Sequence, residues 1–161
     1  ALDRDEFAER VTRLRPRLYA TAKMYLGNEV MAQDALGEAI YKGLRGCKKL
    51  RQPEFFATWM TRIVLNECAA ELRKSRRTVN IDAIPETAAE QFDALPLRDA
   101  VLRLPRELKS VVILRYFSGL TLRETAQALE IPQGTAATRE RRALRLLRLD
   151  FTEEGNGNGQ E

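Results

Sequence analysis

The sequence predicts an all-α protein with two small helical domains joined by a flexible linker. Apolar residues recur at helical spacing over most of the chain, which is typical of amphipathic helices around a core. Residues 79–96 are the exception, because they show no sustained period and contain two prolines. With 161 residues, 44% of them hydrophobic, the chain has room for one ordinary domain or two very small ones. We therefore expect domains at 1–78 and 97–151, a linker at 79–96 and a disordered acidic tail at 152–161.

Three helices are expected in the first domain. The first begins near Asp5 and continues beyond Pro16, which should kink or divide it because proline lacks the amide hydrogen that a helix interior uses. A turn at residues 27–28 leads to a second helix over about 29–44. A third helix over about 53–76 starts at a proline, a favoured residue in the first turn of a helix.

The second domain is expected to contain a helix-turn-helix. A helix is predicted over about residues 105–118, and Thr121 and Glu124 then fit a capping box, in which each side chain binds the backbone amide of the other residue. The short helix that starts there stops at residues 130–133, and a longer helix opens at residue 134 and runs to about 149. Two helices joined by such a tight turn are typical of a DNA-binding domain whose second helix enters the major groove.

The net charge of +4 conceals two basic blocks. Residues 1–78 carry 16 Lys/Arg against 10 Asp/Glu, and residues 97–149 carry 11 against 5. The segments 79–96 and 150–161 each contain four acidic residues and no basic one. Basic blocks attract a polyanion because each neutralised phosphate releases counterions, while an acidic linker can shield them. The pattern favours nucleic-acid binding over its alternative, a merely solvated helical surface.

Composition argues against most enzyme and membrane classes. The chain has no histidine, the commonest general base and metal ligand, and its two cysteines are too few for a zinc site or a disulfide framework. No apolar run approaches the ~18 residues that a membrane span needs, and no secretion signal opens the sequence. We expect a reduced, cytoplasmic protein with no metal, no cofactor, no catalytic residues and no stable membrane insertion of its own.

Helical periodicity sorts the side chains of the last helix. At about 100° per residue, one face carries four candidate base-reading residues, Thr135, Thr138, Arg139 and Arg142. Arginine suits this role because its planar fork can donate two hydrogen bonds to guanine. The remaining arginines are candidate phosphate contacts, which fix position without reading sequence: Arg141, Arg145 and Arg148. The alternative is a helical hairpin with an arginine-rich, solvated face.

Both domains resemble parts of the bacterial extracytoplasmic-function (ECF) sigma factors, group IV of the sigma-70 family. The second domain is similar to promoter-reading domain four, through Leu104-Pro105, Leu114-Arg115-Tyr116, Gly119, Thr121, Glu124-Thr125-Ala126, Ile131-Pro132, Gly134-Thr135, Arg139 and Arg142-Ala143. The first is similar to domain two, through Ala32-Gln33-Asp34-Ala35-Leu36, Glu38, Phe56, Trp59, Ile63, Asn66, Arg73 and Arg76-Arg77. Together these similarities cover about residues 5–149.

The resemblance implies a sigma factor that binds core RNA polymerase and directs promoter-specific transcription initiation. Polymerase would dock on Asp34 and Glu38, one turn apart on one helix face. The minus-ten element would be bound by the loop before the third helix and by that helix, at Lys48, Lys49, Arg51, Trp59, Arg62, Asn66, Arg73, Arg76 and Arg77. The minus-thirty-five element would be bound by the helix-turn-helix, at Thr121, Gly134, Thr135, Thr138, Arg139, Arg141, Arg142 and Arg145. An anti-sigma factor, often tethered to a membrane, is the implied inhibitor.

Several alternatives remain at this point. The chain could be a stand-alone helix-turn-helix regulator that does not bind polymerase core. Trp59 is equally suited to core packing, and Glu38 could pair with Lys42 on the surface. Gly37 departs from the family pattern and weakens its helix by ~1 kcal/mol relative to alanine. Glu140 also departs from it and lies close to the apolar face, where it needs an arginine or a partner because an unpaired carboxylate would be costly.

Overall fold

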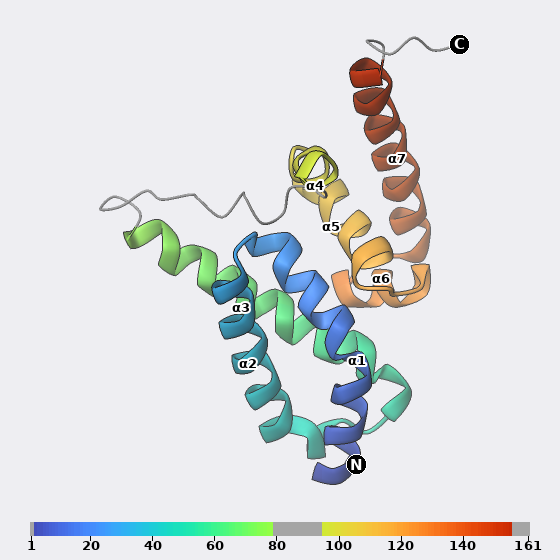
Figure 1. Cartoon of the computed structure of the whole chain (residues 1–161). Coiled ribbons are helices and arrows are strands. Elements are labelled where there is room, and N and C mark those ends of the chain that lie inside the picture. The colour runs from blue at the N-terminus through green and yellow to red at the C-terminus, as the bar shows by residue number, and fades with distance from the viewer. Residues whose placement is uncertain (1, 79–94, 156–161) are drawn as a thin grey trace.

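The computed structural model describes residues 2–78 and 95–155, and within these ranges it is almost entirely helical. The first domain contains α1 (Arg4–Leu26), α2 (Glu29–Gly46), the short helices η1 (Cys47–Lys49) and η2 (Pro53–Phe55), and α3 (Phe56–Thr78). The second contains α4 (Leu95–Leu102), α5 (Arg106–Val112), the π-helical segment η4 (Ile113–Phe117), α6 (Leu122–Leu129) and α7 (Gln133–Gly155). Figure 1 shows α2 and α7 on opposite sides of the molecule, with α1 and α6 between them. The all-α fold with two helical domains is confirmed.

Helix α1 passes through Pro16 without ending, so of the two outcomes expected at this proline, a kink or a division, the division does not occur. Proline removes one backbone hydrogen bond, but the segments on both sides bury apolar side chains in the same core, including Val11 and Leu18. That shared burial holds the two halves in one helix. Its ends are capped as in stable helices: Asp3 and Glu6 form a capping box, and Gly27 closes the C-terminus with φ 70°.

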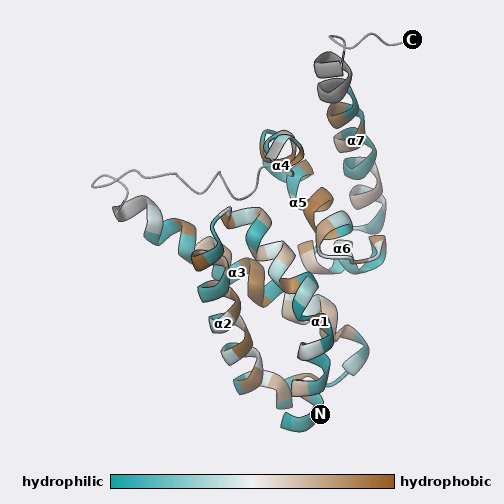
Figure 2. Cartoon of the chain, viewed as in Figure 1, coloured by the Kyte–Doolittle hydropathy of each residue, from teal (hydrophilic) through white to brown (hydrophobic). Residues whose placement is uncertain are grey.

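The core of the first domain lies where α1, α2 and α3 meet. Phe7, Leu36 and Met60 come from the three helices in turn and are each at most 2% exposed. Figure 2 shows hydrophobic and hydrophilic residues alternating along these helices, the pattern of elements with one buried side. Gly43 permits the close packing of α2, because a Cβ there would lie 2.6 Å from Met60 Sδ and 3.1 Å from the Phe7 ring.

The second domain confirms the helix-turn-helix. Thr121 and Glu124 form the predicted capping box, with Thr121 Oγ1 accepting from the Glu124 amide at 3.0 Å. Helix α6 ends at Glu130, whose φ of 59° makes the turn, and α7 begins three residues later. Two features differ from the sequence prediction: α4 was not expected, and α7 continues beyond residue 149 to Gly155. The expected linker and tail lie mostly outside the described residues, at 79–94 and 156–161.

Helix α4 was missed because its sequence carries too few residues for a periodic signal. Its eight residues include Pro96 near the N-terminus, where proline is compatible with a helix although it also marks turns. Tertiary contacts supply what the local sequence does not. Ala100 and Val101 are 2% and 0% exposed, in a cluster with Leu108 of α5 and Leu147 of α7.

The two domains are packed against each other. Met24 of α1 is 4% exposed and belongs to the apolar cluster of the second domain. Ala57 and Leu65 of α3 pack on a second cluster that contains Leu114 and Leu120. A buried hydrogen bond between the hydroxyls of Thr21 and Ser118 crosses the same boundary.

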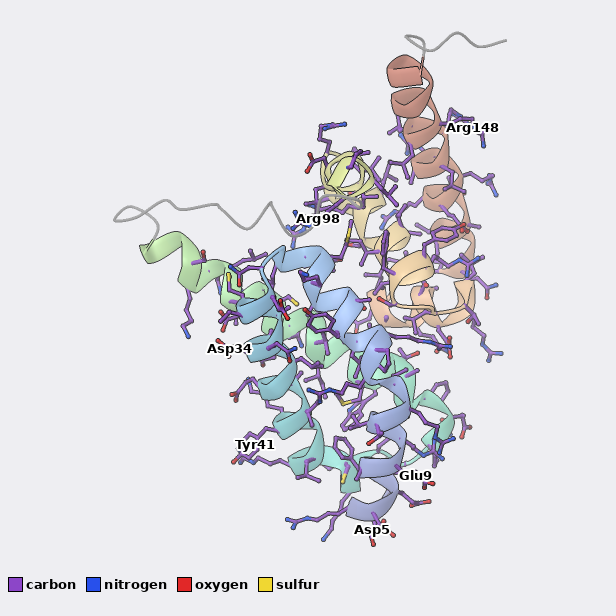
Figure 3. The ribbon with its side chains drawn as sticks, in the orientation of Figure 1. Asp5, Glu9, Asp34, Tyr41, Arg98 and Arg148 are labelled. Carbon is purple, nitrogen blue, oxygen red and sulfur yellow. The ribbon has the colours of Figure 1, made fainter. Side chains whose placement is uncertain are left out.

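Polar contacts extend this boundary to α4. Arg98 Nε donates a hydrogen bond to the Met24 carbonyl at 3.2 Å, and burial lowers the pKa of the Arg98 guanidinium. Figure 3 shows Arg98 reaching from α4 to the end of α1. Gly27 is favoured by its positive φ, and a Cβ there would also force this guanidinium to shift. The structure therefore shows the domains in a closed arrangement.

Candidate nucleic-acid interface

Helix α7 presents a basic outer face and an apolar inner face. Ala136, Ala143 and Leu147 are buried. On the outer face, Thr135 and Arg139 are half-buried, while the other candidate contacts are exposed: Thr138, Arg141, Arg142, Arg145 and Arg148. Figure 3 shows Arg148 pointing away from the rest of the molecule. A long arginine-rich face of this kind matches the shape and charge that major-groove docking requires.

A polar network fixes α7 on η4. Glu140 Oε2 accepts hydrogen bonds from Arg115 Nε at 3.2 Å and from the Tyr116 hydroxyl at 2.6 Å. Arg115 also donates to the Leu120 carbonyl at 3.0 Å. The bond to Glu140 raises the pKa of Tyr116, because the carboxylate favours the protonated phenol. Glu140 therefore pairs with an arginine of its own domain, one of the two outcomes expected for it.

The remaining candidates of the helix-turn-helix lie at helix starts. Thr121 is exposed at the start of α6, but its hydroxyl is already used as the cap acceptor, which leaves its O–H free to donate. Gly134 is exposed in the first turn of α7, and a Cβ there would meet no atom within 4 Å. This open space leaves the helix N-terminus accessible to a phosphate.

The candidates for the minus-ten element are divided between a loop and α3. Lys48, Lys49 and Arg51 are exposed on η1 and the segment after it. Asn66 and Arg73 are exposed on α3, and the side chains of Arg76 and Arg77 lie outside the described part. Arg62 differs from the others because it forms an ion pair with Glu130 of the second domain, with Nη2 and Oε2 2.7 Å apart.

Trp59 is partly in the core. Its ring centroid lies 6.0 Å from that of Phe56, which packs edge-on against Phe7 at 5.8 Å. Phe56 is only 5% exposed, whereas Trp59 is half-buried and packs at the edge of the core. Trp59 is therefore only partly in the core, and its exposed part is open to a ligand. This falls between the two alternatives for Trp59, core packing and contact with the minus-ten element.

Helix α2 carries an exposed acidic surface. Asp34 and Glu38 are exposed and form no ion pair with any described residue. The alternative pairing of Glu38 with Lys42 is wrong, because Lys42 Nζ lies 2.5 Å from Glu67 Oε2 of α3. The hydrogen bond to Glu67 is the main cause of the raised pKa of Lys42. Figure 3 shows Asp34 and Tyr41 pointing away from α1 and α3.

Each of the two domains matches a known protein family. A family described as Sigma-70 region 2 matches residues 10–78, and one described as Sigma-70, region 4 matches residues 94–147. RNA polymerase sigma factor SigV of Bacillus subtilis is 30% identical over 141 residues, which cover 84% of this chain and 85% of SigV. The chain belongs to the ECF sigma factors of the sigma-70 family. ECF RNA polymerase sigma factor SigW of the same species is 27% identical, with 91% of this chain and 89% of SigW covered.

Solved structures share the fold of this sigma factor. CnrH, in complex with the cytosolic domain of CnrY, superposes with a TM-score of 0.77 at 18% identity, covering 94% of this chain and 90% of CnrH. The sigma factor RpoE of Bartonella quintana, in complex with the anti-sigma factor NepR, gives 0.74 at 20% identity, covering 91% and 97%. At these identities the comparison concerns the fold alone.

Sequence reasoning missed two features of this sigma factor. Val30 and Tyr41 are 69% and 54% exposed and extend the acidic surface of α2 with apolar area, at spacings that place them on the same helix face. The signal that could have revealed this surface is the helical spacing of Val30 and Tyr41 relative to Asp34 and Glu38. The second feature is an open hollow of about 390 Å³ between α1 and the start of α3, with Arg10, Arg13 and Arg17 on its α1 side.

Metal sites and membrane spans are two other features to consider in the described residues. Residues 2–78 and 95–155 contain no group of three or more His, Cys, Asp or Glu side chains placed to hold a metal ion. Across the same part of the chain, none of the helices combines the length and apolar character of a membrane span. Sigma factors are transcription initiation factors.

Proposed function

We propose that this ECF sigma factor binds core RNA polymerase through α2 and directs it to promoters that α3 and the helix-turn-helix recognise. The observation that carries the proposal is the combination of two unlike surfaces in one chain. An exposed acidic and apolar face on α2 suits a protein partner, while the arginine-rich face of α7 suits duplex DNA. The chain carries out no bond chemistry in this role.

The sigma-70 region 2 match argues against the alternative of a stand-alone regulator. That match spans α1, α2 and α3, the part that a DNA-binding regulator without polymerase contacts does not need. We assign residues 1–78 to polymerase binding and to the minus-ten element. We assign the part from α4 onwards, rather than from residue 97, to the minus-thirty-five element.

The assignment of site residues follows the exposed surfaces. On α7, the first turns and the face of Arg139 and Arg142 would read base edges, and Arg141 and Arg145 would contact phosphates. On the first domain, Lys48, Lys49, Arg51, Trp59, Asn66 and Arg73 would hold the minus-ten strand. Arg62 would join them once its ion pair with Glu130 opens.

An anti-sigma factor is the proposed inhibitor. CnrH and RpoE, which share this fold, are each named in complex with another protein, and for RpoE that protein is an anti-sigma factor. A protein that stabilises the closed arrangement would keep both basic domains from spanning a promoter. Because its proposed partners are core polymerase and promoter DNA, the sigma factor would act in the cytoplasm. An inhibitor tethered to a membrane would hold it there.

Reconstitution tests the proposed function. The full chain should co-purify with core polymerase and, in transcription from a promoter library, select a common sequence that core polymerase alone does not select. A chain that binds duplex DNA specifically but neither binds core polymerase nor starts transcription would instead support the regulator.

A further inference from the structure

The charge of α2 changes sign at Lys42. Residues 29–41 contain the acidic residues Glu29, Asp34 and Glu38 and no Lys or Arg, and Lys42 follows as the first cation of the helix. Lys42 lies one turn after Glu38, and a glutamate four residues before a lysine is the favourable order for an ion pair along a helix. Such a pair would cancel one charge of the surface that Asp34 and Glu38 form.

The structure places the ammonium of Lys42 on another carboxylate. Lys42 Nζ lies 2.5 Å from Glu67 Oε2 of α3, in a contact that is both an ion pair and a hydrogen bond. The side chain of Glu67 is only 11% exposed, and a charge with so little water around it needs a partner because its burial is otherwise costly. Glu38 is exposed, so water already solvates its charge. The buried carboxylate therefore binds the ammonium in preference to the exposed one.

Glu38 is nevertheless within electrostatic reach of Lys42. The hydrogen bond to Glu67 is the first cause of the raised pKa of Lys42, and the charge of Glu38 adds the smallest contribution in the same direction. The next cation of α2 is also engaged, since the guanidinium carbon of Arg45 lies 5.6 Å from the centre of the Tyr41 ring. The carboxylate surface of α2 thus has two cations nearby, and each is held by a different group.

We propose that Glu67 is a positioning residue for polymerase docking, which keeps Lys42 away from Glu38 and so preserves the charge of both carboxylates on α2. The assignment rests on the proposed function, because it takes its partner from polymerase docking at α2. Glu67 acts through Lys42 rather than by touching the partner, since its own side chain is mostly buried. A basic partner surface then meets both carboxylates without displacing an ammonium from either.

Removal of the buried charge tests the assignment. Glu67→Gln keeps the shape of the side chain and leaves no buried charge unpaired, because Lys42 is 53% exposed and can turn to water or to Glu38. Binding of the full chain to core polymerase is measured for each variant, with folding checked by circular dichroism. For Glu67→Gln we expect about three- to tenfold weaker binding, as for the loss of one complementary charge at an interface. The control Glu9→Gln removes an exposed carboxylate of α1 and should bind as the parent does.

Rescue separates positioning from a structural role. Adding Lys42→Gln to Glu67→Gln removes the released ammonium and should return polymerase binding to the parent level. If the ion pair served only to join α2 to α3, the double variant would bind no better than Glu67→Gln, because the pair is lost in both. Glu38→Gln should also weaken binding less in the Glu67→Gln chain than in the parent, since Lys42 then already cancels that charge.

Two further variants make the result decisive. Lys42→Gln alone tests the proposal even where Glu67→Gln does not fold, and it should bind polymerase at least as tightly as the parent. Weaker binding of Lys42→Gln, or no rescue in the double variant, would overturn the positioning role. Asp34→Lys/Glu38→Lys is the reference for docking. Normal binding of this reference would overturn docking at α2 itself, whereas weak binding of the reference with parental binding of Glu67→Gln would overturn the role of Glu67 alone.

Discussion

At the scale of single residues, the free carboxylates of α2 are the most direct test of polymerase docking. Asp34 and Glu38 are exposed and form no ion pair with another described residue, and Lys42 is held by Glu67 instead. Reversing both to lysine should weaken binding to core polymerase by at least about tenfold, or about 1.4 kcal/mol, because unfavourable charges at an interface are costly. A pull-down with core polymerase measures the loss.

A matched variant exists on α1. Asp5 and Glu9 are also exposed carboxylates one turn apart, and Figure 3 shows them at the N-terminal end of α1, away from α2. Their reversal to lysine changes the net charge equally and should leave polymerase binding unchanged. If both double variants bind polymerase as the parent does, α2 is not the docking surface.

The second residue-scale prediction concerns base reading by α7. Arg139→Ala and Arg142→Ala should each lose ~1–3 kcal/mol of discrimination at particular base pairs if the arginine fork reads guanine. Arg148→Ala, on the exposed outer side, should weaken binding to all sequences alike. Competition binding with single-base variants of the selected promoter measures both effects. A uniform loss for Arg139 and Arg142 would make them phosphate contacts.

Element-scale stability is tested by two glycines of α2. Gly37 lies in the helix interior, and a Cβ there would meet no atom within 4 Å. Gly37→Ala should therefore raise the free energy of unfolding by about 0.5–1 kcal/mol, because alanine loses less backbone entropy. Gly43→Ala should instead lower it by about 1–3 kcal/mol, since its Cβ would press on Met60 and Phe7. Thermal unfolding followed by circular dichroism compares them, and equal shifts of the same sign would contradict the packing around Gly43.

At the same scale, the sequence predicted the elements with strong local signals. The Thr121–Glu124 box and the buried Ala136 and Ala143 could be predicted because capping and periodicity are local properties. Helix α4 could not, because its burial depends on helices far along the chain. The local sequence did not decide between a kinked and a divided α1 for the same reason, since packing on both sides of Pro16 outweighs one missing hydrogen bond.

For the site, the sequence identified the charged residues but not their partners. Periodicity placed Glu140 near an apolar face, and only the fold shows that Arg115 and Tyr116 satisfy it. The α1 hollow was missed because its two walls are some forty residues apart in sequence. Arg62 was assigned to the minus-ten element, and only the fold shows that it forms an ion pair with Glu130 across the domain boundary.

At the scale of the whole molecule, the closed arrangement conflicts with simultaneous binding of two promoter elements. Elements centred near minus ten and minus thirty-five are roughly 25 base pairs apart, on the order of 80 Å at ~3.4 Å per base pair. Domains in direct contact cannot cover that distance. Residues 79–94 can extend to about 55 Å, which allows the domains to separate without unfolding. Opening is therefore a requirement of the proposed function.

The last prediction follows from that requirement. Labels on Arg15→Cys of α1 and Arg148→Cys of α7, both exposed, should report one short distance in the free chain and a longer one in the promoter-bound holoenzyme. The native thiols should label poorly, because Cys47 and Cys68 are both buried. Burial is also the main cause that raises the pKa of Cys68 to about 12, which keeps its thiol protonated. An anti-sigma factor should restore the short distance and compete with core polymerase. Identical distance distributions in all three states would refute the opening model, and would leave promoter binding to be explained by a different placement of the two domains on DNA.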